Sequence, residues 1–160
     1  MAAVDYFLKL DTIKGEAKDT NFPDQIPLLS FSHGGEQASS IGTGTGGHGA
    51  GKVSLHPFTL TKHVDKSSVP LFKALVNGTH IATGTLSAVK AGANRKPYYT
   101  VALKVVLVSS YIISAVDENP IESITLSFEE IKIEYFAQDD KGTVASTGSA
   151  SWNVIKNSGS

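Results

Sequence analysis

The chain opens with hydrophobic and polar positions that alternate with a period of two. Hydrophobic side chains lie on one face of this opening stretch, at Val4, Tyr6, Leu8 and Leu10. Charged side chains lie on the other face, at Asp5, Lys9 and Asp11. A period of two is typical of a half-buried β-strand, and the polar residues 14–16 that follow predict a turn.

Most of the remaining chain shows the same strand pattern. We predict strands over six further ranges: 26–33, 53–62, 81–90, 98–113, 121–136 and 143–154. The alternation slips by one position at His56-Pro57 and again at Glu129-Glu130, and such a slip predicts a β-bulge. The range 98–113 is apolar on both faces over much of its length, so we expect both of its faces to be covered.

One helix is predicted, over residues 68–77. Ser67 or Ser68 can serve as its N-cap, Pro70 fits the first turn, and Asn77-Gly78 supplies the stop. Its hydrophobic stripe has helical spacing and consists of Leu71, Phe72, Leu75 and Val76. Long bulged strands with a single short helix predict a mainly β fold, a curved antiparallel β-barrel or sandwich with one flanking helix and a long glycine-rich loop. We expect a single domain over residues 1–160.

The glycine-rich segment 34–51 is expected to form that loop. It contains two patterns known from phosphate-binding loops, G-x-G-x-x-G at 42–47 and G-x-x-x-x-G-K at 46–52. These patterns hold phosphate where a hydrophobic strand leads in and a helix leads out. Here a polar stretch leads in, a predicted strand leads out, and Val53 stands where the second pattern requires Ser or Thr. We therefore expect no nucleotide site.

Composition argues against several further classes of function. The 160 residues carry a formal net charge of −1, which gives no electrostatic reason to expect nucleic acid or an anionic membrane as a partner. The chain has no cysteine, its five histidines show no metal-ligand spacing, and no G-x-S-x-G motif is present. We expect no enzyme activity, no cofactor and no metal site. The N-terminus lacks the positive run and apolar segment of a Sec-type signal, and no apolar run is long enough to span a membrane.

Motifs spread over nearly the whole chain resemble the haemolysin-coregulated protein family. DYFLKLDTIKGE at 5–16 resembles the start of that family, and IPLLSFSHG at 26–34 resembles its second strand. Residues 51–70, LVSSY at 107–111 and WNV at 152–154 follow in the family's order. The resemblance implies a curved barrel with one flanking helix that assembles as a six-membered ring. It also implies that the rings stack into the inner tube of a bacterial type VI secretion system.

The same resemblance implies where the chain acts and what it contacts. Its partners would be further copies of itself in a homohexamer and in stacked rings, secreted effector proteins in the lumen, a tube-tip spike protein and a surrounding sheath. The chain would be cytoplasmic during assembly and then secreted without a cleaved signal peptide. The alternative is a monomer or small oligomer whose β-barrel binds a small ligand, and a large internal cavity would favour that alternative.

Two sets of residues are candidate contact sites. On strand 26–33 the alternation places Leu29, Phe31 and His33 toward the core. Ser30 and Ser32 then point the other way, as candidates for contact with the lumen and its effectors or as a plain solvent-facing surface. The second set is expected to contact a neighbouring subunit or ring, because ordering a flexible loop takes a partner. It consists of Gly42, Gly44, Gly46, Gly47, His48 and Gly49.

Overall fold

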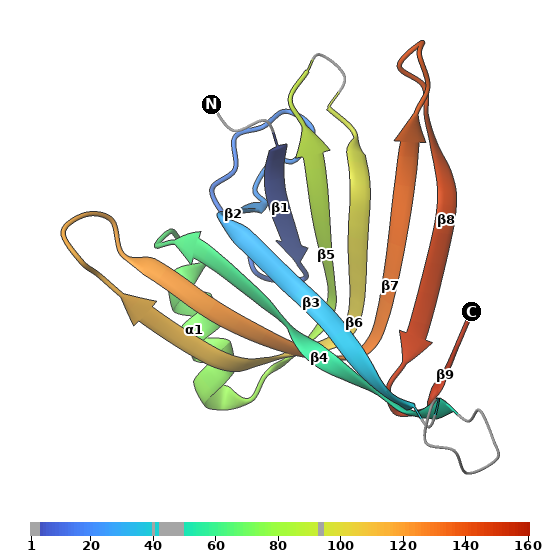
Figure 1. Cartoon of the computed structure of the whole chain (residues 1–160). Coiled ribbons are helices and arrows are strands. Elements are labelled where there is room, and N and C mark those ends of the chain that lie inside the picture. Colours follow the sequence, from blue (N-terminus) through green and yellow to red (C-terminus); the bar gives the residue numbers. More distant parts are fainter. Residues whose placement is uncertain (1–3, 40, 42–49, 93–94) are drawn as a thin grey trace.

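Two 18-residue strands, β6 (Pro97–Ser114) and β7 (Ile121–Gln138), form a long antiparallel hairpin on which the other strands assemble. The computed structural model of the chain describes residues 4–39, 41, 50–92 and 95–160. Figure 1 shows that both strands bend sharply near their middle. One hairpin therefore contributes to two walls of the molecule.

The bend changes which positions of β6 face inward. On one side of it the buried residues are Val101 and Leu103, and on the other side they are Val106 and Val108. Between them Val105 has a φ of 54°, a left-handed conformation that β-branched residues rarely adopt. The backbone thus turns at Val105, and the inward phase moves by one residue.

Among the described residues, the remaining strands extend the hairpin on both sides into one curled sheet of nine strands. Beyond β6 lie β5 (His80–Lys90), β1 (Val4–Leu10) and β2 (Ile26–Leu28), in that order. Beyond β7 lie β4 (Ala50–His63) and β3 (Ser30–Ser39), and also β8 (Val144–Asn153) with β9 (Ser158–Gly159). The sheet curls until β2 runs on through Leu29 into β3. The backbone N–H of Leu29 donates to the Thr61 carbonyl oxygen at 2.8 Å. The predicted class, a curved antiparallel β-fold with one helix, is confirmed.

The sheet branches along the outer edge of β7. The first part of β7 pairs with β4, from Ile121 opposite His63 to Leu126 opposite Phe58. The second part pairs with β8 instead, from Glu130 onward. The hairpin β3–β4 therefore pairs with β7 only as far as Phe58, and the rest of the hairpin extends beyond this pairing.

The main core fills the space inside the curl. Its largest fully buried apolar side chains come from six strands and the helix: Leu8, Ile26, Phe58, Leu60, Leu71, Ile81, Leu86, Leu103, Ile124 and Leu126. A smaller cluster, formed by Phe7, Ala17, Phe22 and Val89, buries the opposite face of β1 and β5 beneath the segment that joins β1 to β2. Strands β1 and β5 are thus covered on both faces, which fixes their place in the sheet.

Helix α1 (Ser68–Asn77) follows the prediction closely. It ends at Gly78, whose φ of 61° is a left-handed conformation that glycine adopts without steric cost. Leu71 and Ala74 are buried against the core, whereas Phe72 keeps 51% of its surface exposed. Ser67 occupies the N-cap position, but its side chain makes no capping hydrogen bond because it donates to Asp65 instead.

Two of the strand predictions need correction, and one predicted irregularity is confirmed. The predicted strand 26–33 is divided at Leu29, which is 45% exposed because the chain passes there from one end of the sheet to the other. The far end of β6 is not covered on both faces, since Ile112 and Ile113 are exposed. The slip at His56-Pro57 is confirmed as a register shift between β3 and β4.

The slip at Glu129-Glu130 is real, but its predicted cause is wrong. The buried positions of β7 are even-numbered up to Leu126, and the next buried position is the odd-numbered Ile131. The pairing with β6 nevertheless continues in register across this point. The cause is the bend that both strands share. The shift that β6 does show against β7 lies elsewhere, between Val108 and Ser110.

The glycine-rich segment is shorter as a loop than the sequence suggests. Gly34 and Gly35 lie in β3, opposite His56 and Leu55 of β4, and Gly51 lies in β4. A side chain at Gly35 would come within 2.8 Å of the Leu55 side chain, so this glycine allows the two strands to approach closely. Residues Gly42–Gly49 lie outside the described residues.

The two faces of α1 predict different costs of truncation. We expect Leu71→Ala to lower the free energy of unfolding by about 2–5 kcal/mol, because it leaves a cavity in the core. Phe72→Ala should cost about 1 kcal/mol, mainly from its edge-to-face contact with Tyr111. Urea unfolding monitored by circular dichroism measures both, and equal costs would contradict this assignment of the helix faces.

Candidate functional site

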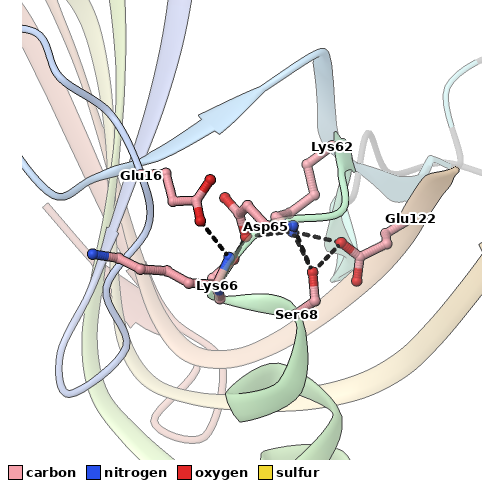
Figure 2. Close-up of polar contacts among 7 residues, drawn as sticks. Glu16, Lys62, Asp65, Lys66, Ser68 and Glu122 are labelled. Carbon is pink, nitrogen blue, oxygen red and sulfur yellow. Dashed lines mark hydrogen bonds and ion pairs between the residues drawn. The ribbon is translucent and has the colours of Figure 1, made fainter. Parts of the chain in front are cut away.

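A fully buried ion pair joins β4 to β7 beside the start of α1. Lys62 and Glu122 are both completely buried, and the Lys62 Nζ lies 2.6 Å from the Glu122 Oε1. The Lys62 Nζ also lies 3.0 Å from the Asp65 Oδ1 and donates to the Ser68 Oγ at 3.2 Å. Figure 2 shows these four side chains converging on one point. All three N–H groups of the ammonium therefore have an oxygen partner.

The same cluster fixes the turn that connects β4 to α1. The Ser68 hydroxyl donates to the Glu122 Oε1 at 2.7 Å and accepts the backbone N–H of Asp65 at 3.0 Å. The Lys66 N–H donates to the Glu16 Oε1 at 3.2 Å, which ties the turn to the segment after β1 (Figure 2). The first turn of the helix is thus held by side chains from three parts of the chain.

The cluster brings a serine and a lysine together, but its geometry favours a structural role. An ammonium that donates to two carboxylates and a hydroxyl has no lone pair with which to accept the serine proton. Nearby, burial and then the Glu122 carboxylate raise the pKa of Tyr111 to about 12, so its phenol stays neutral at physiological pH. We interpret the cluster as a buried structural ion pair rather than as a catalytic centre.

The prediction from sequence missed this cluster, although a signal for it exists. Lys62 continues the inward phase of Phe58 and Leu60, and Glu122 shares the inward phase of Ile124. A charged residue in the hydrophobic phase of each of two strands indicates a buried pair. The alternation does not show which strands are neighbours. It therefore could not predict that Lys62 lies directly opposite Glu122.

An aromatic stack lines the interior beside the main core. The rings of Phe31 and Phe58 are stacked 5.8 Å apart, and the His33 ring lies between Phe58 and Tyr99 at about 6 Å from each. The His33 Nε2 forms a 2.7 Å hydrogen bond with the Tyr99 hydroxyl. Burial lowers the pKa of His33, which favours the neutral form of its ring. The predicted inward direction of Phe31 and His33 is confirmed, whereas that of Leu29 is wrong.

A cavity of about 490 Å³ opens next to this stack, where β3 and β4 stand apart from β7 and β8. Its apolar wall is formed by Val53, Leu55, Phe128, Ile131, Ile133 and Trp152. Polar groups at its edge come from Gln37, Lys52, Ser151 and Asn157. We call this cavity the branch groove, because it lies where the sheet divides.

The opposite face of the β3–β4–β7 wall is covered with hydroxyl groups. Ser30 and Ser32 are exposed there, and the Ser30 Oγ forms a 2.6 Å hydrogen bond with the Thr61 Oγ1. Paired register carries the same face across the neighbouring strands, through Thr59, Thr61, Ser123 and Thr125. We call this set, with Ser30 and Ser32, the hydroxyl face. Its extension beyond the two predicted serines was missed, although the alternation in FTLT at 58–61 and SITLS at 123–127 contains it.

The other predicted sites have different outcomes. Gly42, Gly44, Gly46, Gly47, His48 and Gly49, the expected ring or stacking contacts, lie outside the described residues. Gly51, Lys52 and Val53 lie in β4, so the G-x-x-x-x-G-K pattern leads into a strand and not into a helix. Among the described residues, no group of three or more histidine, aspartate or glutamate side chains is placed to hold a metal ion. The described helix is too short to cross a membrane.

Breaking the buried pair should be far more costly than breaking an exposed one. Lys62→Met leaves the buried Glu122 carboxylate and the partly buried Asp65 carboxylate without their cation. We expect it to lower the free energy of unfolding by about 3–5 kcal/mol. Lys104→Met is the matched control, since Lys104 and Glu130 form an exposed cross-strand pair at 3.7 Å whose loss should cost less than about 1 kcal/mol. Chemical denaturation measures the free energy of unfolding of both variants. Comparable losses would contradict a structural role for the buried ion pair of Lys62.

Comparison with known proteins places this geometry in context. A family model described as "Type VI secretion system effector, Hcp" matches residues 7–135. The chain is 37% identical to protein hcp1 of Pseudomonas aeruginosa, over 97% of this chain and 98% of that protein. A solved structure of a type six secretion system protein superposes with a TM-score of 0.92 at 28% identity, covering 99% of this chain and 100% of the other. Hcp1 from Salmonella typhimurium superposes with a TM-score of 0.80, also at 28% identity and with the same coverage.

Proposed function

The chain belongs to the Hcp family of type VI secretion system proteins, and we propose that it is the subunit of a homohexameric ring. In this proposal the rings stack into the secretion tube, and the whole of residues 1–160 acts as one tube-protein domain. Family membership, over nearly the full length of both chains, is the observation that carries the proposal. The family is a structural and secreted one. This agrees with the structural role that we assign to the buried cluster of Lys62, Ser68 and Glu122.

The hydroxyl face supports a role as the lumen wall. It is formed by small side chains on three paired strands, and it lies opposite the core face of the same strands. Small hydroxyls donate and accept hydrogen bonds in several directions, so such a wall can contact varied cargo without large apolar anchors. We propose that secreted effector proteins contact this wall, with Ser30 and Ser32 at its exposed margin.

The proposed partners and location follow from this role. They are further copies of the chain, effector proteins in the lumen, a spike protein at the tube tip and a sheath around the tube. We propose assembly in the cytoplasm followed by export with the tube. The branch groove fits the size of a ligand pocket. It does not by itself favour a separate ligand-binding barrel, because the full-length similarity is to secretion proteins.

Ring formation is directly measurable. Native mass spectrometry of the purified full-length chain at micromolar concentration should show a hexamer, since a ring subunit has complementary surfaces that close on themselves. Size-exclusion chromatography with light scattering provides an independent mass. A monomer at every concentration tested would overturn the proposal.

Crowding the lumen wall should affect cargo without affecting the ring. Ser32→Gln places a bulky group on the hydroxyl face, and we expect it to leave ring mass unchanged while reducing co-purification of a luminal effector several-fold. Thr83→Gln is the matched control, because Thr83 is an exposed hydroxyl on β5, outside the hydroxyl face. Equal effector retention by Ser32→Gln, Thr83→Gln and the unmodified chain would remove Ser32 from the cargo surface.

A further inference from the structure

Two apolar surfaces formed by the described residues differ in shape. One is the branch groove, a concave surface. The other is convex and lies on α1, where Val69, Phe72 and Val76 are exposed by 76%, 51% and 61%. These three positions share one side of the helix, because their spacing of three and four residues matches the helical repeat. We call this side the helix ridge.

The helix ridge is rigidly supported. Leu71 and Ala74 anchor the buried side of α1 in the core, and the Phe72 ring makes an edge-to-face contact with Tyr111 of β6 at 5.8 Å. Ile113, on the same strand face as Tyr111, is also exposed. An apolar patch of this kind on a soluble subunit marks an interaction surface more often than an accident of composition.

The branch groove has the properties of a receptor for such a ridge. Its walls carry Trp152 and Phe128, and aromatic side chains of this kind contribute strongly to protein interfaces. Its volume of about 490 Å³ is in the range of pockets that enclose whole ligands, so it can accept more than one apolar side chain. Of the described lining residues, Lys52 is the one with a permanent charge, and it is exposed. Apolar side chains can therefore enter without burying an unpaired carboxylate.

The two surfaces lie on opposite sides of the subunit. In Figure 1, α1 and the turn between β6 and β7 lie on the left, whereas β8, β9 and the far end of β3–β4 lie on the right. A ring of more than two subunits requires such an arrangement, since each subunit must present two different and complementary surfaces to its two neighbours. The hydroxyl face belongs to the wall between them.

From these observations we infer that the helix ridge of one copy of this chain docks in the branch groove of the next copy. The inference rests on the proposed ring and identifies the surfaces that form it. Phe72 is the principal side chain inserted, and Trp152 is the principal side chain that receives it. The contact is head-to-tail, so the same pair of surfaces repeats around the ring.

Single charged substitutions provide the first test. Phe72→Glu alters the ridge, and Ala150→Glu alters the groove at a residue that lines it and is exposed. Each variant should be monomeric by native mass spectrometry at a concentration where the unmodified chain is a ring. Thr83→Glu, on neither surface, should still form rings, and circular dichroism should show the same fold in all three variants.

Mixing the two variants provides a sharper test. The Phe72→Glu subunit keeps an intact groove, and the Ala150→Glu subunit keeps an intact ridge. A head-to-tail contact therefore predicts a 1:1 heterodimer that cannot grow, because both of its free surfaces are defective. Contacts elsewhere on the subunit would give no such heterodimer, and its absence from the mixture would overturn the inference.

The sole tryptophan of the chain, Trp152, reports on the groove directly. Its fluorescence should shift to the blue and become protected from acrylamide when the unmodified chain assembles, and neither change should occur in Phe72→Glu. Rings that persist in both charged variants, or rings in which Trp152 stays open to acrylamide, would overturn this contact while leaving the proposed ring intact. A chain that forms no ring without any substitution would instead refute the proposed function.

Discussion

The fold depends on the bend that β6 and β7 share. Val105 adopts a left-handed conformation that costs a non-glycine residue roughly 1 kcal/mol or more, so the rest of the structure must hold it in place. Because both strands turn together, a single hairpin borders the barrel interior on two sides. The bend also separates the two partners of β7, since β4 pairs before it and β8 pairs after it. The branch groove is a direct consequence of this change of partner.

The buried pair of Lys62 and Glu122 fixes the register at the other end of β4. The two residues lie directly opposite each other. A slip of one strand by one position would turn its charged residue toward the hydroxyl face and leave the other charge buried without its partner. In the native register they also hold Ser68 and Asp65, so the start of α1 is coupled to the same pair. A buried ion pair contributes little net stability compared with apolar packing. Its value here lies in excluding the wrong register and the wrong helix position.

Local patterns in the sequence were sufficient to predict the elements of this fold. Pro70 and Asn77-Gly78 bound the helix by backbone chemistry that acts within a few residues, and the alternation in 53–62 gives both the strand and its bulge. What could not be predicted depends on contacts between distant segments. The division of strand 26–33 at Leu29 arises because β2 pairs with β1 while β3 pairs with β4. The glycines at 34 and 35 read as a loop, but pairing with β4 orders them as a strand. The resemblance to a family led to the prediction of a ring, whereas the residues that meet in the branch groove could be found only from the structure.

One alternating pattern produces three surfaces with different roles. On the β3–β4–β7 wall, the inward phase supplies the core and the aromatic stack, and the outward phase supplies the hydroxyl face. Where β3 and β4 separate from β7 and β8, inward-facing apolar side chains from both sides line the branch groove. Pairing with a neighbour's helix ridge would bury those side chains at no cost to the hydroxyl face, because the two lie on opposite sides of the same strands. In the proposed ring, the subunit would thus assemble through apolar contacts and still present a polar wall to the lumen.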